Sequence, residues 1–251
     1  GKHVHIGARA ILKNGKKVNI FTAKDAAHHF MNPIGFGALM GILKNYEIIN
    51  PFVSATNDAF NRLKPGFEAP VCVVTSLGKG IDVPSRNRTV LVGLVRDIQS
   101  PAATHFELRS PNPKSNTYLV LASSLVCMLD GINACLRAEK DPVALERSLS
   151  KEYGREDFYL EKDRRYRTEL NIFTEFSDAD RARYYGKAPA TVWENITNFD
   201  DCADKTRLLI ESGVMTQKDV ASYKAAVTDQ WVTDLHDRIL DNARVFVRSC
   251  K

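Results

Sequence analysis

The sequence predicts an α+β fold, in which a curved, mainly antiparallel sheet from residues 1–110 is backed by helices and followed by a helical tail. Two patterns lead to this expectation. Short stretches of strand character, separated by turn residues, occupy the first part of the chain and lead into a long apolar helix. From residue 141 to the end, the pattern is rich in charge and helical. We therefore expect two regions, at 1–140 and 141–251.

The strand predictions rest on two kinds of pattern. Residues 3–6 and 105–109 alternate polar and apolar side chains, as in a strand with one buried face. Residues 69–77 and 89–98 are β-branched runs of strand length, joined by glycine and proline turns. Together these four segments predict the sheet.

The helix predictions follow from apolar residues spaced three and four apart. The first helix, at 35–50, places five apolar side chains on one side: Phe36, Leu39, Met40, Leu43 and Tyr46. Residues 116–138 predict a long helix, buried on most of its circumference. Residues 141–189 are dense in both charges and predict a solvated helical insertion with mobile loops. Helices at 191–213 and 216–250 follow.

Composition narrows the class of protein. The 251 residues carry a net charge of +5 with both signs interspersed, which favours a mixed solvated surface over a nucleic-acid footprint. The five cysteines show neither metal-ligand spacing nor a disulfide framework, which fits free thiols in a reducing cytoplasm. We find no secretory signal, and no apolar run of the roughly 20 residues that a membrane span needs. We therefore expect a cytoplasmic protein with neither nucleic-acid nor membrane partners.

Two predicted strands carry ionisable residues on one face. Residues two apart in a strand share a face, so the first strand presents His3 and His5 together. The second presents His105, Glu107 and Arg109 in the same way. If both faces line one cavity, an imidazole and a carboxylate can share a divalent cation, and a guanidinium beside them can hold a carboxylate or phosphate.

Each of these signals is weak when taken alone. An H-x-H pair binds a metal about one time in five. A Glu and an Arg two apart on a strand more often form a surface ion pair worth about 0–1 kcal/mol. The order and context of further motifs decide between the two readings.

Several stretches resemble the glutamine synthetase family. Residues 1–5, Gly-Lys-His-Val-His, resemble its G-x-H-x-H strand. Residues 61–70, Asn-Arg-Leu-Lys-Pro-Gly-Phe-Glu-Ala-Pro, closely match its N-R-L-x-P-G-[FY]-E-A-P loop. Shorter matches follow in the family's order: the N-R pair at 87–88, the E-x-R-x-P-D-P-like strand at 106–113, the L-D-G-I helix end at 129–132 and the closing helices at 208–223. The likeness covers most of the chain except about 141–189.

The resemblance implies that the chain is the C-terminal half of a glutamine synthetase catalytic region, from a divergent, long-type member. In this family ATP phosphorylates the side-chain carboxylate of glutamate, and ammonia attacks the γ-glutamyl phosphate. Mg²⁺ or Mn²⁺ and arginines are then expected to stabilise the developing charge. Glutamate, ammonia and ATP are the expected partners of a homo-oligomeric full-length protein.

The resemblance also implies roles for single residues. His3 and Glu107 are ligands of the metal nearer the nucleotide phosphates. Arg62 and Arg109 hold the glutamate substrate. Glu68, on a loop that covers the site, contributes to the glutamate site, takes the proton from ammonium and shields the intermediate from water.

Two further residues are expected at the nucleotide. Arg88 matches the arginine that faces the transferred phosphate, and His5 lies near the nucleotide. The alternative for Arg62 and Glu68 is an ordinary ion pair on a loop, and Arg86 or Arg96 could take the place of Arg88.

The sequence departs from the family around the nucleotide. Gly7 stands where the family has a serine, and Gly93 and Ala102 stand where basic residues are expected. His105 occupies a position where arginine is common, and about eight extra residues lie near 78–85. Nearby cations that could compensate are Arg86, Arg96 and Lys79.

The first residue is Gly1 instead of Met, which suggests a fragment or a processed product. The resemblance implies that carboxylates upstream of this chain complete both metal sites, and that an N-terminal β domain completes the site of a neighbouring subunit. We therefore expect the chain to be inactive without that N-terminal half, and to expose a sheet edge prone to association. Two other functions stay open: a glutamate–amine ligase of the same family, and a catalytically silent relative with an assembly or regulatory role.

Overall fold

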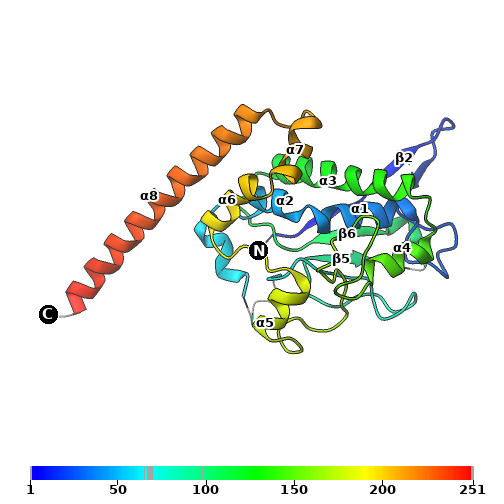
Figure 1. Cartoon of the computed structure of the whole chain (residues 1–251), viewed down its shortest axis with the longest axis horizontal. Coiled ribbons are helices and arrows are strands. Elements are labelled where there is room, and N and C mark those ends of the chain that lie inside the picture. The colour runs from blue at the N-terminus through cyan, green and yellow to red at the C-terminus, as the bar shows by residue number, and fades with distance from the viewer. Residues whose placement is uncertain (1, 65, 67–69, 98, 250–251) are drawn as a thin grey trace.

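The computed structural model describes residues 2–64, 66, 70–97 and 99–249. A helical layer covers one face of a small sheet, and a long C-terminal helix leaves this body (Figure 1). The strands are β1 (Val4–Ile6), β2 (Arg9–Ile11), β3 (Lys17–Asn19), β4 (Thr75–Ser76), β5 (Val92–Val95) and β6 (His105–Leu108).

Most of the remaining regular structure is helical. The α-helices are α1 (Pro33–Lys44), α2 (Tyr46–Val53), α3 (Thr117–Arg137), α4 (Pro142–Leu149), α5 (Asp178–Asp180), α6 (Val192–Asp201), α7 (Ala203–Glu211) and α8 (Gln217–Ser249). Shorter turns are the 3₁₀-helices at Asn57–Arg62 and Pro101–Ala103 and a π-helix at Arg181–Tyr185.

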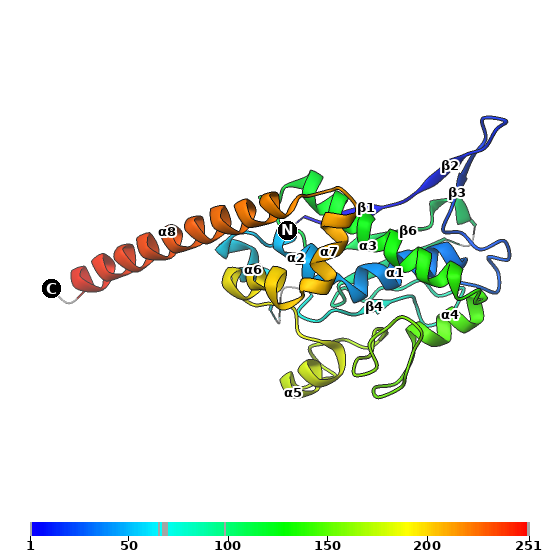
Figure 2. The same ribbon diagram turned by 45° about the horizontal axis from the view of Figure 1, so that its top comes forward.

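The main sheet has the strand order β1-β6-β5-β4. The pairs β1–β6 and β5–β6 are antiparallel, and β4–β5 is parallel. Strands β2 and β3 form a separate hairpin that extends from the body (Figure 2). The predicted α+β fold with a mainly antiparallel sheet before residue 110 is confirmed.

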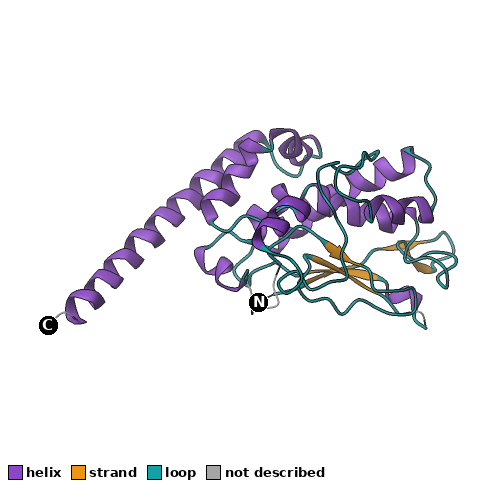
Figure 3. Cartoon of the chain, turned by 60° about the horizontal axis from the view of Figure 1, so that its bottom comes forward, coloured by secondary structure: helices purple, strands orange, loops and turns teal. Residues whose placement is uncertain are grey.

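The sheet and helices form separate layers, as Figure 3 shows. The two layers meet in one apolar core that includes Phe36 and Leu39 of α1, Phe106 of β6 and Val120 of α3. This core continues beyond residue 140 as far as Val227.

Helices α1 and α3 pack closely because glycines face each other at their contact. A Cβ atom built on Gly41 would lie 2.0 Å from the carbonyl oxygen of Cys127. One built on Gly131 would lie 2.1 Å from the carbonyl oxygen of Gly37. Only glycine allows the two backbones to approach this closely.

The predicted helix at 35–50 is two helices, because the chain turns at Asn45 between α1 and α2. The Asn45 amide donates to the Asp130 carboxylate at 3.0 Å and to the Tyr159 hydroxyl at 3.2 Å. These partners lie far away in the sequence, so the local apolar spacing gave no sign of the break.

The long helix α3 has the predicted limits, with Asn116 as its N-cap and Ala138 as its C-cap. The expectation that most of its circumference is buried is wrong. Tyr118 is 86% exposed and Leu129 57% exposed, on a face that no other part of the described chain covers. By length and composition alone α3 could cross a membrane, contrary to the expectation that the chain has no such segment. Its other face packs against α1 in the apolar core.

The charged segment at 141–189 is not a solvated helical insertion. It contains only short helices, and it buries Tyr166 and Tyr185 completely. Its backbone covers the outer edge of β4. There the amide of Thr75 donates to the carbonyl of Tyr166, and the carbonyl of Thr75 accepts from the amide of Thr168. Many of its charges pair within the segment, as Arg167 does with Glu146. Arg164 and Glu161 also pair with Glu47 and Lys205, which the local sequence could not indicate.

Helix α8 contacts the body along its length up to Arg238, whose guanidinium pairs with Asp58 at 2.8 Å. Trp231 stacks on Trp193 of α6 with ring centroids 5.7 Å apart, and the Tyr223 hydroxyl donates to the carbonyl of Pro51. Beyond these contacts the helix extends away from the body (Figure 1).

Candidate functional site

The polar face of the sheet is formed mainly by β1 and β6, which pair with His5 opposite Glu107. The apolar residues of these strands, such as Val4, Phe106 and Leu108, are buried. The polar residues between them therefore point to the other side of the sheet, away from the helices. The alternation predicted from the sequence is confirmed.

Glu107 joins His3 and Arg109 in one network. Its Oε1 lies 2.6 Å from Nδ1 of His3, and its Oε2 lies 2.7 Å from Nη1 of Arg109. The Arg109 side chain is only 5% exposed, and its Nε donates to the carbonyl of Arg88. Its Nη2 has no hydrogen-bond partner among the described residues. Because an unpaired buried donor is costly, this nitrogen is suited to an anionic ligand.

The surroundings of His3 favour its neutral form. Burial, and next the positive charge of Arg109, lower the pKa of His3, while Glu107 acts in the opposite direction. A neutral imidazole is the form that binds a metal ion.

His3 and Glu107 fit part of a divalent-metal site. Their nitrogen and oxygen donors are adjacent, and carboxylate oxygens are the ligands that Mg²⁺ and Mn²⁺ prefer. Within the described part of the chain, no group of three or more His, Cys, Asp or Glu side chains is arranged to hold a metal. The chain thus offers a ligand pair, and further ligands would have to come from water, substrate or other protein segments.

His5 is paired with His105, beside His3 and Glu107. Nδ1 of His5 lies 2.9 Å from Nε2 of His105, and Nδ1 of His105 lies 2.5 Å from the carbonyl oxygen of Ala103. In neutral rings, His105 must donate to that carbonyl, so His5 donates to His105. Both rings line an open pocket of about 610 Å³ that also contains Gly7 and Ala102.

Arg62 contacts the backbone after β6. Its guanidinium donates to the carbonyls of Arg109 at 3.0 Å and Pro111 at 3.2 Å. Burial, followed by the charge of Arg109, lowers the pKa of Arg62. The sequence predicted a ligand-binding role for Arg62, and nothing in the sequence indicated these backbone contacts.

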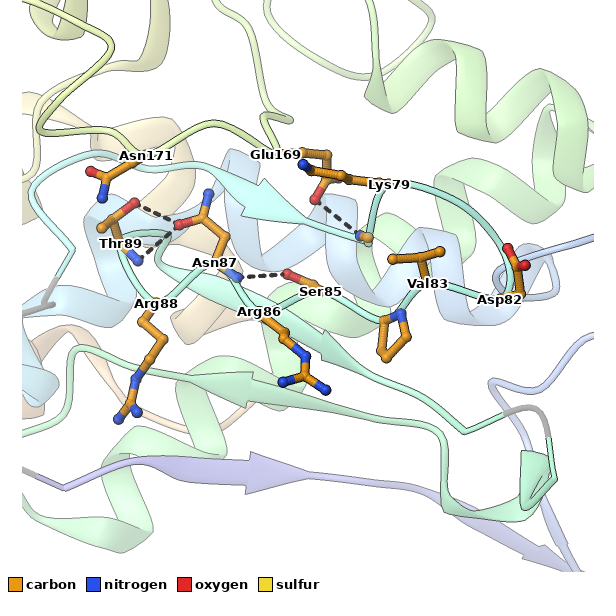
Figure 4. A pocket seen from close by; sticks show the side chains of 12 residues that line it. Lys79, Asp82, Val83, Ser85, Arg86, Asn87, Arg88, Thr89, Glu169 and Asn171 are labelled. Atoms are coloured by element: carbon orange, nitrogen blue, oxygen red, sulfur yellow. Dashed lines mark hydrogen bonds between the residues drawn. The ribbon is translucent and has the colours of Figure 1, made fainter.

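Two neighbouring pockets share the loop at 84–88. The first, of about 590 Å³, extends toward Glu169 and Asn171. The second, of about 550 Å³, lies over β5 and β6 and is lined by Glu107 and Arg109. Arg86 and Arg88 line both, and Figure 4 shows their side chains extending to the same side of the loop. The structure thus brings Arg88, Glu107 and Arg109 to one cavity.

Glu68 lies outside the described residues, so its position relative to the site stays a prediction. The sequence indicates Arg86 only as a substitute for Arg88. Its spacing of two from Arg88 in an extended loop was the signal that both could face one pocket.

The fold and this site define an α+β protein that carries a His–Glu–Arg network and an arginine-lined pocket on one sheet face. Residues 1–152 match the family model described as glutamine synthetase, catalytic domain. The chain belongs to the glutamine synthetase family.

Curated relatives agree with this assignment. The chain is 34% identical to the glutamine synthetase of Aquifex aeolicus over 132 residues, which cover 53% of this chain and 25% of the relative. It is 32% identical to the Pseudomonas aeruginosa glutamine synthetase over 193 residues, which cover 71% of this chain and 37% of the relative. The matches thus span between a quarter and about two fifths of the relatives' length.

Solved structures share the fold. A Plasmodium falciparum glutamine synthetase superposes with a TM-score of 0.60 at 17% identity, covering 93% of this chain and 44% of that one. GmaS in complex with ADP gives a TM-score of 0.55 at 19% identity, covering 94% of this chain and 42% of that one.

Proposed function

We propose that the chain forms part of an ATP-dependent glutamate–ammonia ligase site. In this reaction ATP phosphorylates the side-chain carboxylate of glutamate, and ammonia displaces the phosphate. The observation that carries the proposal is the network of His3, Glu107 and Arg109 beside an arginine-lined pocket. It combines metal-ligand chemistry with anion binding on one sheet face, as phosphoryl transfer requires.

In this proposal, His3 and Glu107 hold a Mg²⁺ or Mn²⁺ ion. When bound, such an ion neutralises phosphate charge and orients the phosphate oxygens. Glu107 has a second task, because its other oxygen fixes the Arg109 guanidinium. The unpaired Nη2 of Arg109 is then oriented to bind a carboxylate oxygen of glutamate.

The remaining residues are assigned to substrate and nucleotide. Arg88 faces the transferred phosphoryl group, and His5 lies near the nucleotide. Arg62 contributes to the glutamate site, in part by fixing the backbone that follows Arg109. Glu68 takes the proton from ammonium and covers the intermediate.

The proposed reaction requires more protein than this chain contains. Among the described residues, two candidate metal ligands are too few for a closed site, so we infer that carboxylates of the N-terminal half complete it in a homo-oligomer. The chain alone is therefore expected to be inactive. We infer a cytoplasmic location from the absence of a disulfide framework in the sequence.

An assay of the full-length protein tests the proposal. ATP- and glutamate-dependent phosphate release would be measured with ammonia, methylamine or ethylamine as acceptor. Release with ammonia supports the ligase. Release with amines alone would replace it by a glutamate–amine ligase. No release with any acceptor would favour the silent relative, which the missing charges at Gly93 and Ala102 motivate.

Glu68→Ala tests the base within the active full-length protein. We expect glutamine formation to fall at least about a hundredfold, because a positioned general base contributes a factor of this order. Mn²⁺ affinity should not change, since Glu68 is not assigned to the metal. Glu211→Ala, at the exposed end of α7, is the matched control. Wild-type turnover by Glu68→Ala would remove this residue from the mechanism.

A further inference from the structure

The loop between the two pockets is held by Asn87. Its Oδ1 accepts from the amide of Thr89 at 3.0 Å and from the Thr89 hydroxyl at 2.6 Å. Its Nδ2 donates to the carbonyl of Leu170 at 2.7 Å. Asn87 thus points into the protein, and its neighbours Arg86 and Arg88 extend to the opposite side (Figure 4).

The pocket over β5 and β6 carries an excess of positive charge. Four arginines line it (Arg86, Arg88, Arg96 and Arg109), against the single carboxylate of Glu107. That carboxylate already pairs with His3 and Arg109. An anion is therefore the ligand that the electrostatics of this pocket favour.

The arginines differ in what they are free to bind. Arg96 donates to the carbonyls of Ile81 and Ala26, so its guanidinium is engaged in holding the fold. Arg86 is exposed and forms no hydrogen bond or ion pair with the described part of the chain. Lys79 lines only the other pocket. Besides Arg88, which the proposed function assigns to the transferred phosphoryl group, Arg86 is thus a cation able to reach a ligand here.

The floor of this pocket is open at Gly93. Gly93 lies opposite Glu107 on neighbouring strands. A Cβ atom built there would meet nothing closer than Oε2 of Glu107, at 3.9 Å. Space for a ligand, or for a larger side chain, therefore exists beside the carboxylate.

We propose that Arg86 binds a phosphate oxygen in the space above Gly93. Arg86 then provides, from the loop at 84–88, a positive charge at a place where β5 itself carries only a glycine. The ligand class is a polyphosphate, such as the phosphate chain of a nucleotide. This inference rests on the proposed ligase function and assigns a specific residue to its phosphate site.

The assignment is tested by measuring the affinity of the full-length protein for inorganic tripolyphosphate by titration calorimetry. Arg86→Ala should weaken binding about 10-fold to 100-fold, since a charge-assisted hydrogen bond is lost. Arg86→Lys keeps the charge but loses the planar fork, and should lie between the two. Arg137→Ala, at the exposed end of α3, removes the same charge elsewhere and should bind as the unaltered protein does.

A second variant moves the charge instead of removing it. Arg86→Ala combined with Gly93→Arg should bind tripolyphosphate more tightly than Arg86→Ala alone. Unchanged affinity in Arg86→Ala, or an equal loss in Arg137→Ala, would overturn the assignment, as would an unaltered protein that does not bind tripolyphosphate.

The outcome is separable from that of the ligase assay. A protein without ligase activity that still binds tripolyphosphate through Arg86 would refute the proposed function and keep the phosphate site. A working ligase in which Arg86→Ala changes neither tripolyphosphate affinity nor the KM for ATP would refute this inference alone.

Discussion

At the scale of single residues, the spacing of polar side chains was the feature of the sequence that best predicted the candidate site. Residues two apart on two strands predicted that His3, Glu107 and Arg109 could share a cavity, and they form one network. The sequence could not predict that Arg62 would bind carbonyl groups. Those contacts depend on how a distant loop packs against the end of β6.

Glu107→Ala should reduce stability because it leaves Arg109 buried without its carboxylate. The expected loss is about 2–3 kcal/mol in the free energy of unfolding, somewhat below the range for fully buried pairs because Glu107 is partly exposed. Urea unfolding of the chain would measure it. The double variant Glu107→Ala/Arg109→Met should regain part of the loss. Equal stability of Glu107→Ala and the unaltered chain would show that the pair contributes little.

At the scale of secondary-structure elements, alternation and helical spacing predicted β1, β6 and α3 well, because these elements are set by local pattern. Other limits depended on distant partners. The break at Asn45 is fixed by Asp130, and the short strand β4 ends where the segment near Thr168 covers it. Neither partner is visible from the local sequence.

Gly41→Ala should destabilise the α1–α3 contact, because its Cβ would lie 2.0 Å from a backbone oxygen that cannot rotate away. We expect a loss of about 1–3 kcal/mol or more, as for other overpacked cores. Thermal and urea unfolding would detect it. Gly93→Ala is the control, since a Cβ there has ordinary space and should change stability little. Equal effects of both substitutions would contradict this account of the helix contact.

At the scale of the whole molecule, a charge cluster joins three distant segments. Arg164 pairs with Glu47 at 3.2 Å and Glu161 at 3.3 Å, and Lys205 pairs with the same carboxylates at 3.0 and 2.8 Å. The charged composition of 141–189 suggested a solvated surface. Arg164 and Glu161 of this segment have partners on α2 and α7, so only the folded chain could show the cluster.

The cluster predicts a dependence of stability on pH. Burial alone would raise the pKa of Glu161, but Lys205 and Arg164 outweigh it and leave the pKa below the ordinary value of 4.5. Below about pH 4.5 the unfolded chain therefore binds the proton more readily than the folded chain. The stabilisation is full above this pH and is lost as the pH falls through the folded-state pKa.

Lys205→Met tests this cluster. At pH 7 it should lower the free energy of unfolding by about 1–3 kcal/mol, because two partly buried carboxylates lose a partner. The difference from the unaltered chain should shrink in urea unfolding at pH 4. Lys218→Met, at an exposed position of α8, should show neither effect. A pH-independent loss would mean that packing, not charge, accounts for the effect.

Metal binding by the full-length protein tests the central claim most directly. Mn²⁺ binding would be followed by electron paramagnetic resonance in the unaltered protein and in His3→Gln, Glu107→Gln and the double variant. Each single variant should weaken the same Mn²⁺ site by about tenfold or more, and the double variant should affect no additional site. Unchanged Mn²⁺ affinity in both single variants would contradict a metal site built on His3 and Glu107.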